Sequence, residues 1–379
     1  MVVKHLRLVD RPASATARDA LLRRGKRIDV ATLLDDAVLR AQETDVPGRA
    51  AVSGFTWEPH DSGTELWYPQ GVTTSADATG SGAAGTSGRN VVVVSWYAHE
   101  GALRNGARLT FVDLDTLHYR HVLLVRARRT PWGVCILPVP IHAGGIAWYG
   151  PYLYVAATRA GVYVFRVEDL LELPPRRRKG VAGRLGYDMV LPVHHRLTSR
   201  GRDAGSRVRY SFLSLAHGLP DTDSPPALVA GEYGGVGKTQ RLWRYALDPE
   251  THLPRRGADG HATPDELHPD QSPRMQGATV LDGTWYVTTS QGRGNAGDLL
   301  VGEPGAFRRH KRVLPTGCED IAAWPQRRQL WSVTEWPWMR WVYAVDADAW
   351  PGPVAPPPAE QSGARPIPPR PPASGAAPS

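Results

Sequence analysis

The chain has 379 residues, of which 41% are hydrophobic and 22% charged, and its formal net charge is +8. This size and apolar content exclude a chain that is disordered throughout, and the two cysteines, Cys135 and Cys318, do not suggest a disulfide scaffold or a metal cluster. No apolar run reaches the length of a signal peptide or a membrane span, so we expect a soluble, cytoplasmic protein with no membrane partner. It would be secreted only if the start codon is misassigned.

The basic residues form scattered clusters. They are residues 23–27, Arg126–Arg129, Arg176–Lys179 and Arg308–Arg312. A nucleic-acid-binding patch and a set of solvated loops are the two interpretations. We favour solvated loops, and hence no nucleic-acid partner, because the clusters share no element and no recognised binding motif.

Residues 1–50 are expected to form a helical extension that does not belong to the repeat found in the following residues. A short basic helix is predicted over Ala13–Arg24, and Asp29 is a good N-cap for a second helix, Val30–Glu43. The second helix carries an apolar stripe of Leu33, Leu34, Ala37, Val38 and Ala41. We expect the stripe to pack on the outside of the main domain of a monomer, and a dimerisation helix is the alternative.

Beyond residue 50, a pair of short apolar strands recurs five times. The first strands begin near Gly71, Ile146, Leu213, Ala278 and Ile321. The second strands run through Val91–Val94, Tyr152–Ala156, Ala227–Ala230, Trp285–Thr288 and Leu330–Val333. A recurring four-strand unit predicts an all-β fold, a β-propeller over residues 51–350. In the third unit the fourth strand is poorly marked and is expected around His252–Gly257.

The fifth unit lacks an obvious fourth strand, and the isolated strand Val52–Trp57 is available to supply it. Pairing the start of the chain with its end would close the ring and remove exposed sheet edges. The count therefore favours five blades, with six as the runner-up because the long region Val181–Tyr210 has room for irregular strands. Residues 351–379 are rich in Pro, Ala, Gly and Ser and predict a disordered C-terminal tail.

The repeat also predicts where a site lies. In a propeller blade the loop entering the first strand and the loop leaving the second open on the same face, around one mouth. The entering loops bring Gln70, His142, Gln276 and Glu319-Asp320, with Tyr210 or Ser211. The leaving loops bring residues 96–100, Thr158-Arg159, Glu232-Tyr233, residues 291–293 and residues 335–338. These residues differ from blade to blade, which favours one small-molecule site over repeated lectin-like pockets.

Three acids and one histidine are the catalytic candidates. Glu232 and Glu335 follow the second strands of the third and fifth units, and two acids facing one pocket can act as acid and base or hold a divalent cation such as Ca²⁺. Because strand side chains alternate, one of Glu319 and Asp320 should face away from the axis, and we favour Glu319 as the axial residue. His142, in a glycine-rich segment, is a candidate proton carrier or metal ligand, and a hydrogen-bonded core histidine is the alternative.

The substrate-binding candidates are amides, cations and aromatic rings. They are Gln70, Trp96, Tyr97, His99, Arg159, Gln276, Gln291, Arg293, Trp336 and Trp338. Arg159 or Arg293 would orient an anionic group. Trp336 and Trp338, facing Trp96 and Tyr97, would form an aromatic wall for an aromatic or sugar-like ligand. Residues 234–239 resemble a phosphate-binding loop, but the first glycine is replaced by Glu232 and a strand follows, so nucleotide binding is not expected.

Three segments carry a resemblance to known propellers: His142–Ala156, Gln276–Thr288 and Glu319–Val333. Their Gly-Ile/Val-Ala and Leu-Tyr-Val pattern resembles the broad superfamily of gluconolactonase/regucalcin-type, strictosidine-synthase-like and NHL-type propellers, over roughly Gly71–Val345. In the lactonase branch, acids and an asparagine hold a central divalent metal that serves hydrolysis. The resemblance implies such positions for Glu232, Glu319 and Glu335, whereas Gln70 and Gln276 stand where the asparagine is expected.

The sequence therefore predicts one small-molecule site at the mouth of a propeller. The expected chemistry is hydrolysis or elimination by carboxylates, with or without a divalent metal. The alternative is a non-catalytic propeller that binds a ligand or another protein.

Overall fold

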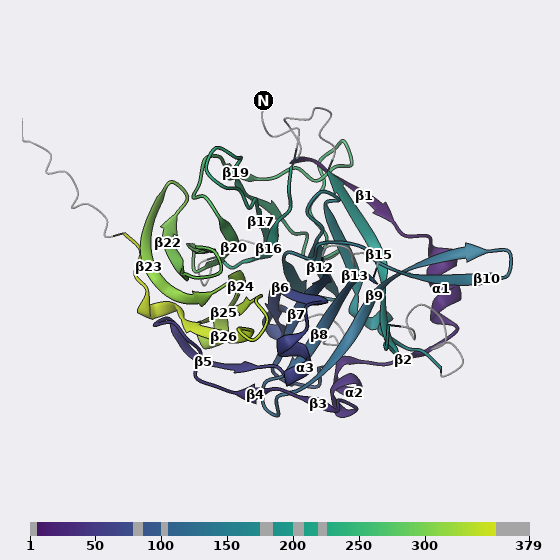
Figure 1. The fold of residues 1–379 in the computed structure, drawn as a ribbon. Coiled ribbons are helices and arrows are strands. Elements are labelled where there is room, and N and C mark those ends of the chain that lie inside the picture. Colours follow the sequence, from purple (N-terminus) through teal and green to yellow (C-terminus); the bar gives the residue numbers. More distant parts are fainter. Residues whose placement is uncertain are drawn as a thin grey trace, which may run out of the picture.

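A computed structural model of the chain describes residues 6–78, 86–99, 105–174, 185–199, 208–218 and 226–353. The fold is mostly β, with short helices near the N-terminus (Figure 1). The helices are α1 (Ala15–Leu22), α2 (Val30–Asp35) and α3 (Pro59–Gly63). Across the described residues, no helix is long and apolar enough to cross a membrane.

The long strands form successive antiparallel sets of four neighbours. The first set is β6 (Trp67–Thr74), β7 (Val91–Ala98), β8 (Ala107–Asp113) and β9 (His118–Thr130). The second is β11 (Ile146–Tyr149), β12 (Tyr152–Ala156), β13 (Val162–Arg166) and β15 (Met189–Ser199). The third is β16 (Phe212–Ala216), β17 (Ala227–Gly231), β18 (Leu242–Ala246) and β19 (Glu266–His268). The fourth is β20 (Met275–Leu281), β21 (Thr284–Thr289), β22 (Ala296–Glu303) and β23 (Ala306–Thr316).

The last set joins the two ends of the chain, as the sequence predicts. It consists of β24 (Cys318–Trp324), β25 (Gln329–Thr334), β26 (Trp341–Asp346) and the early strand β5 (Ala51–Thr56). Strand β5 is antiparallel to β26, with Phe55 opposite Val342. Both of these side chains are buried in the same apolar cluster, so burial as well as the backbone ladder holds the closure together.

The first strands of the sets are neighbours in cyclic order. Strand β6 contacts β11, β11 contacts β16, β16 contacts β20, β20 contacts β24, and β24 returns to β6. Their close approach requires positions without a side chain: a Cβ on Gly145 would lie 2.1 Å from the backbone nitrogen of Leu213 in the next set. The buried Asp320 carboxylate adds a tie across two sets, since its Oδ2 accepts from the backbone N–H groups of Val72 (3.4 Å) and Ile146 (3.2 Å).

The prediction of a long second helix is wrong. The Asp29 side chain does cap α2, accepting from the Thr32 N–H at 2.8 Å, but the helix ends at Asp35 and Val38 is 83% exposed. The following residues form the edge strands β3 (Leu39–Arg40), against β9, and β4 (Gln42–Glu43), against β5. Pairing with those sheet edges gives hydrogen-bond partners to the backbone N–H and C=O groups that a longer helix would have paired within itself.

Several other strands differ from the sequence-based expectation. Strand β1 (Leu8–Pro12) was not foreseen and pairs with β15, and β10 (Gly133–Pro138) extends β9 into a long hairpin. The short strands β2 (Lys26–Arg27) and β14 (Leu171–Glu172) pair with each other. The fourth strand of the third set is β19 and not His252–Gly257, because β18 pairs with a segment of the polar insertion. The expected disordered tail lies outside the described residues from position 354 onward.

The close packing of the inner strands predicts that position 145 does not accommodate a side chain. We expect Gly145→Ala to lower the free energy of unfolding by about 1–3 kcal/mol, because the added methyl group meets backbone atoms of the neighbouring set that cannot rotate away. Urea denaturation measures the change. Gly294→Ala is the matched control, since a Cβ there meets nothing within 4 Å, and equal losses in both variants would contradict the packing argument.

Candidate active site

A cavity of about 720 Å³ opens where the inner strands begin. It is lined by Gln70, His142, Thr158, Arg209, Ser211, Tyr233, Arg274, Gln276, Ser290, Gln291, Gly292, Glu319, Glu335 and Trp336. Most of these residues belong to the loops that the repeat assigns to the mouth. Residues from every set therefore converge on one concave space.

Irregular pairing at the start of three inner strands places the central side chains. Gln70 in β6 and Gln276 in β20 are each an extra residue in the pairing with the second strand. In β24 the pairing passes from Cys318↔Thr334 to Ile321↔Ser332, so Glu319 and Asp320 stand opposite one residue. Such bulges re-aim side chains, and they place both amides and Glu319 at the cavity.

The bulge in β24 also changes one expectation about side-chain direction. Strand alternation predicts that Asp320 points away from the axis, yet both acids are buried: Glu319 is 2% exposed and Asp320 is fully buried. Glu319 lines the cavity, whereas Asp320 reaches the backbone of β6 and β11. Alternation fails here because two residues of β24 face one of β25.

Glu319 and Glu335 form a hydrogen-bonded pair of carboxyl groups in this cavity. An amide supports each member: Gln276 Nε2 donates to Glu319 Oε1 at 3.0 Å, and Gln70 Nε2 donates to Glu335 Oε2 at 2.9 Å. Each glutamate therefore has one oxygen fixed by an amide, and the hydrogen bond between the carboxyls needs a shared proton.

Burial raises the pKa of both carboxyl groups. The pKa of Glu319 lies well above its usual range because the group is buried and faces the charge of Glu335. Burial raises the pKa of Glu335 to about 7, against the opposing effect of the hydrogen bonds from Gln70 and Glu319. Near neutral pH Glu335 is therefore partly ionised, and Glu319 keeps its proton to a higher pH than a free carboxyl group does.

His142 lines the same cavity as a neutral base. His142 is exposed at the cavity wall, and the neighbouring protein lowers its pKa by partial desolvation, so the imidazole is uncharged at pH 7. Its ring is 4.0 Å from the ring of Tyr97, centroid to centroid. The histidine can therefore accept or donate a hydrogen bond in the cavity without adding charge.

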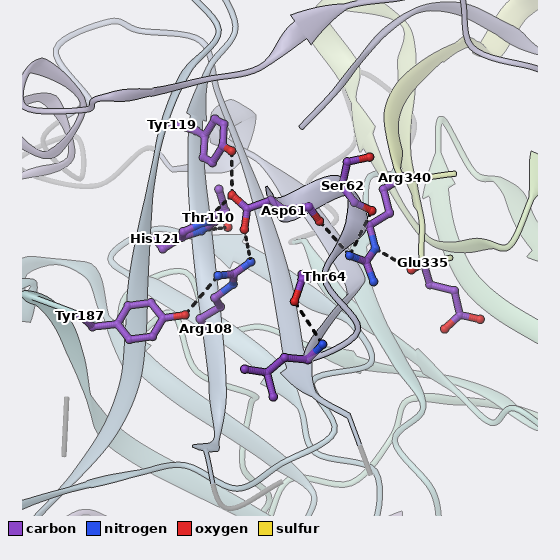
Figure 2. Close-up of polar contacts among 11 residues, drawn as sticks. Asp61, Ser62, Thr64, Arg108, Thr110, Tyr119, His121, Tyr187, Glu335 and Arg340 are labelled. Atoms are coloured by element: carbon purple, nitrogen blue, oxygen red, sulfur yellow. Dashed lines mark hydrogen bonds and ion pairs between the residues drawn. The ribbon is translucent and has the colours of Figure 1, made fainter. Parts of the chain in front are cut away.

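A buried network lies behind Glu335 (Figure 2). Arg340, fully buried, donates from Nε to the backbone oxygen of Glu335 at 2.9 Å and from Nη1 to that of Asp61 at 2.8 Å. The Asp61 carboxylate lies 3.0 Å from His121 Nε2 and accepts from Arg108 at 2.8 Å and from the Tyr119 hydroxyl at 2.7 Å. Burial raises the pKa of Asp61, but His121, Arg108 and Tyr119 together hold it below the usual range. The network positions the backbone that carries Glu335.

Several predicted site residues lie outside the cavity wall. Glu232 is fully buried, and its carboxylate forms two hydrogen bonds of 2.8 Å with Arg241, so the expected facing of Glu232 and Glu335 does not occur. Arg159 is exposed and is absent from the lining. Arg293 is also absent, but its guanidinium lies 5.4 Å from the Trp336 ring.

The expected aromatic wall does not form, because its members point in different directions. Trp96 is fully buried, with the Arg108 guanidinium 4.5 Å from its ring, and His99 stacks on Tyr68 at 4.7 Å. Trp338 is 69% exposed, and Tyr97 stands behind His142. Trp336 alone of the predicted tryptophans lines the cavity.

Three lining residues were missed by the sequence analysis: Arg209, Arg274 and Ser290. Each lies one or two positions before a residue that the repeat does assign to the mouth, namely Tyr210, Gln276 and Gln291. Widening each loop by one or two positions would have included them.

The donor set does not fit a resident divalent cation. Among the residues that the structure describes, no group of three or more His, Cys, Asp or Glu side chains is placed to hold a metal ion. The two acids of the cavity are bonded to each other, and the neighbouring amides present nitrogen donors to them. Calcium prefers six to eight oxygen ligands, which this arrangement does not supply.

Comparison with known proteins finds only distant structural likeness. No protein-family model matches the chain, and no curated protein matches its sequence. Among solved structures, the GH43_1 enzyme from Xanthomonas citri complexed with xylotriose is 12% identical, covers 87% of this chain and 93% of its own, and has a TM-score of 0.37. Kuenenia stuttgartiensis hydrazine synthase is 14% identical and covers 71% and 74%, with a TM-score of 0.34.

A third likeness is to the β-propeller domain of Myceliophteria thermophila Cps50 (Swd1). It is 9% identical, covers 81% of this chain and 99% of its own, and has a TM-score of 0.34. These matches assign no family to the chain.

The raised pKa of Glu335 predicts a pH-dependent stability. A folded pKa of about 7 against 4.5 means that the native state retains a proton that the unfolded chain loses, so this contribution is complete below about pH 4.5 and disappears as the pH rises through 7. Because the side chain is partly exposed, we expect about 2 kcal/mol of unfolding free energy to be lost over that range.

Denaturant unfolding at pH 4.5, 6 and 8 measures this loss. Glu335→Gln has no carboxyl group to titrate at this position and should show a flatter profile than the wild type. Glu303→Gln, on an exposed strand end, should keep the wild-type profile. Parallel profiles for all three proteins would contradict the raised pKa.

Proposed function

We propose that the chain is a five-bladed β-propeller whose mouth is the active site of a hydrolase acting on a small molecule, with Glu319 and Glu335 as the acid/base pair. The observation that carries the proposal is that Glu319 and Glu335 line one cavity of about 720 Å³, each held by an amide, and that each acid influences the pKa of the other. Two carboxyl groups whose pKa values are raised and separated are a recurrent acid/base arrangement. The domain is taken as residues 51–350, preceded by the 1–50 extension.

The pair can supply both proton transfers of a hydrolysis. The ionised Glu335 takes a proton from water as the water oxygen bonds to the carbonyl carbon. Glu319 gives its proton to the leaving oxygen as the bond between that oxygen and the carbonyl carbon breaks. Glu335 is then protonated and Glu319 ionised. Transfer of the proton across their hydrogen bond restores the starting state, so no other reactant is consumed.

The spacing favours a carbonyl substrate over a glycosidic bond. Carboxyl groups in retaining and inverting glycosidases are about 5–5.5 Å and about 6.5–9.5 Å apart, because a sugar carbon or a water stands between them. Glu319 and Glu335 are hydrogen-bonded directly. A shared proton suits water attack on an ester or lactone carbonyl, and Trp336 offers a ring surface for a sugar-like or aromatic group.

Replacing either acid by its amide tests the proposal. The purified protein is assayed against nitrophenyl esters and sugar lactones, and we expect Glu319→Gln and Glu335→Gln to lower kcat/KM by about 10²–10⁴-fold, because each removes one proton transfer. The wild-type kcat/KM should change with pH around 7, the pKa of Glu335.

Glu303→Gln is the control and should keep full activity, because Glu303 is exposed and does not line the cavity. If ligands bind but no substrate is turned over, or if both amide variants stay active, the alternative of a non-catalytic binding propeller replaces the hydrolase.

A further inference from the structure

We propose that the ligand of this cavity carries an anionic group, a carboxylate or a phosphate, which Arg209 and Arg274 bind. The inference rests on the proposed function in placing the ligand in the same cavity. It adds the chemical class of that ligand and assigns the recognition to two arginines that line the wall.

The two arginines border one short stretch of backbone. The loop between β17 and β18 passes through Gly234, where an added Cβ would lie 3.5 Å from Arg209 Nη2. The backbone N–H of Arg274 donates to the Gly234 oxygen at 2.8 Å. Arg209, Gly234 and Arg274, from three separate parts of the chain, thus meet at one point of the cavity wall, and the two arginines are cations.

The neighbouring acid is already neutralised by a third arginine. Glu232 accepts two hydrogen bonds from the Arg241 guanidinium and one from the backbone N–H of Arg209 at 3.0 Å, and it also interacts with the Thr239 side chain. Arg241 therefore has a structural role at this position. Within the described ranges, the Arg209 guanidinium hydrogen-bonds to the neutral Thr239, through contacts of 3.4 Å to its backbone oxygen and hydroxyl.

Both lining arginines retain unused donors. The Nε atom of Arg209 is buried without a hydrogen-bond partner, and no side-chain hydrogen bond or ion pair to Arg274 occurs within the described part of the chain. Arg209 is half-buried and Arg274 is exposed at the cavity wall, so both side chains are accessible to an anion, which they would bind through charge-assisted hydrogen bonds. A guanidinium can bind a carboxylate or phosphate through two parallel hydrogen bonds.

The charge balance of the cavity points the same way. Its wall carries two arginines, and the only acids on it are the protonated Glu319 and the partly ionised Glu335. Arg293 adds a positive charge beside Trp336, and the exposed Lys238 lies on the loop that holds Gly234. An anion entering this mouth is therefore attracted, and the concave shape focuses the field.

Trp336 defines the rest of the ligand. Its ring lines the cavity together with Tyr233 and His142, so a ring-shaped body can stack there while its anionic group reaches the arginines. A sugar acid or a sugar phosphate has both features. The carboxylate and the phosphate share the same recognition chemistry, and a pair of probes separates them.

Calorimetric titration with D-glucuronate, glucose 6-phosphate and glucose tests the proposal, because the three share one ring and differ in charge. We expect at least one anion to bind about tenfold or more tightly than glucose, with the stronger of the two identifying the group. Arg209→Gln and Arg274→Gln should each remove that preference without weakening glucose binding. Arg308→Gln, an exposed arginine of β23, is the matched control and should leave it intact.

The result is separated from the hydrolase proposal by repeating the titrations with Glu335→Gln. Preference for an anion in this variant, lost on combining it with Arg274→Gln, supports the anion site even if no hydrolysis is found. Equal affinity for the charged and uncharged sugars, an arginine-independent preference, or no binding of either anion at millimolar concentration would overturn the anion site, whatever the outcome of the activity assays.

Discussion

The close approach of the inner strands around one axis is the constraint on which the other features depend. Successive inner strands come so near that Gly145 and Gly277 leave no space for a Cβ, since the nearest atoms would be backbone atoms of the next set at 2.1 and 2.6 Å. The Asp320 carboxylate then accepts N–H groups from two of those strands. This packing determines where the strands begin, and so where the cavity opens.

The same region also carries the polar side chains of the cavity, because three of the inner strands, β6, β20 and β24, contain bulges. A regular strand would turn successive residues to opposite faces, but the extra residues Gln70, Gln276 and Glu319 break that alternation and face one cavity. Two amides and a carboxyl group are brought together from three sheets. Glu335 completes the group from the loop after β25. Arg340 holds it there, because its guanidinium donates hydrogen bonds to the backbone oxygens of Glu335 and Asp61.

Some charged side chains of the protein form buried ion pairs that stabilise the fold, and others line the cavity. Pairs such as Glu232 with Arg241 and Asp61 with Arg108 are buried and mutually neutralised, and removing one partner would leave an uncompensated charge. The cavity differs from these pairs. Its two acids influence each other's pKa, and within the described ranges its arginines, Arg209 and Arg274, form no ion pair, so positive charge at the mouth has no protein counter-charge.

The sequence by itself determined the repeat, the closing strand and most of the mouth, because strand periodicity and antiparallel order are local properties of the chain. Gln70, His142, Gln276, Glu319, Glu335 and Trp336 were all found in this way. Only the tertiary structure decided which acids meet. Glu232 and Glu335 hold equivalent places in the repeat, yet Arg241, nine residues beyond Glu232, neutralises that acid, while Glu319 reaches Glu335 through a bulge. Such outcomes depend on side-chain partners and pairing irregularities, which a repeat pattern does not encode.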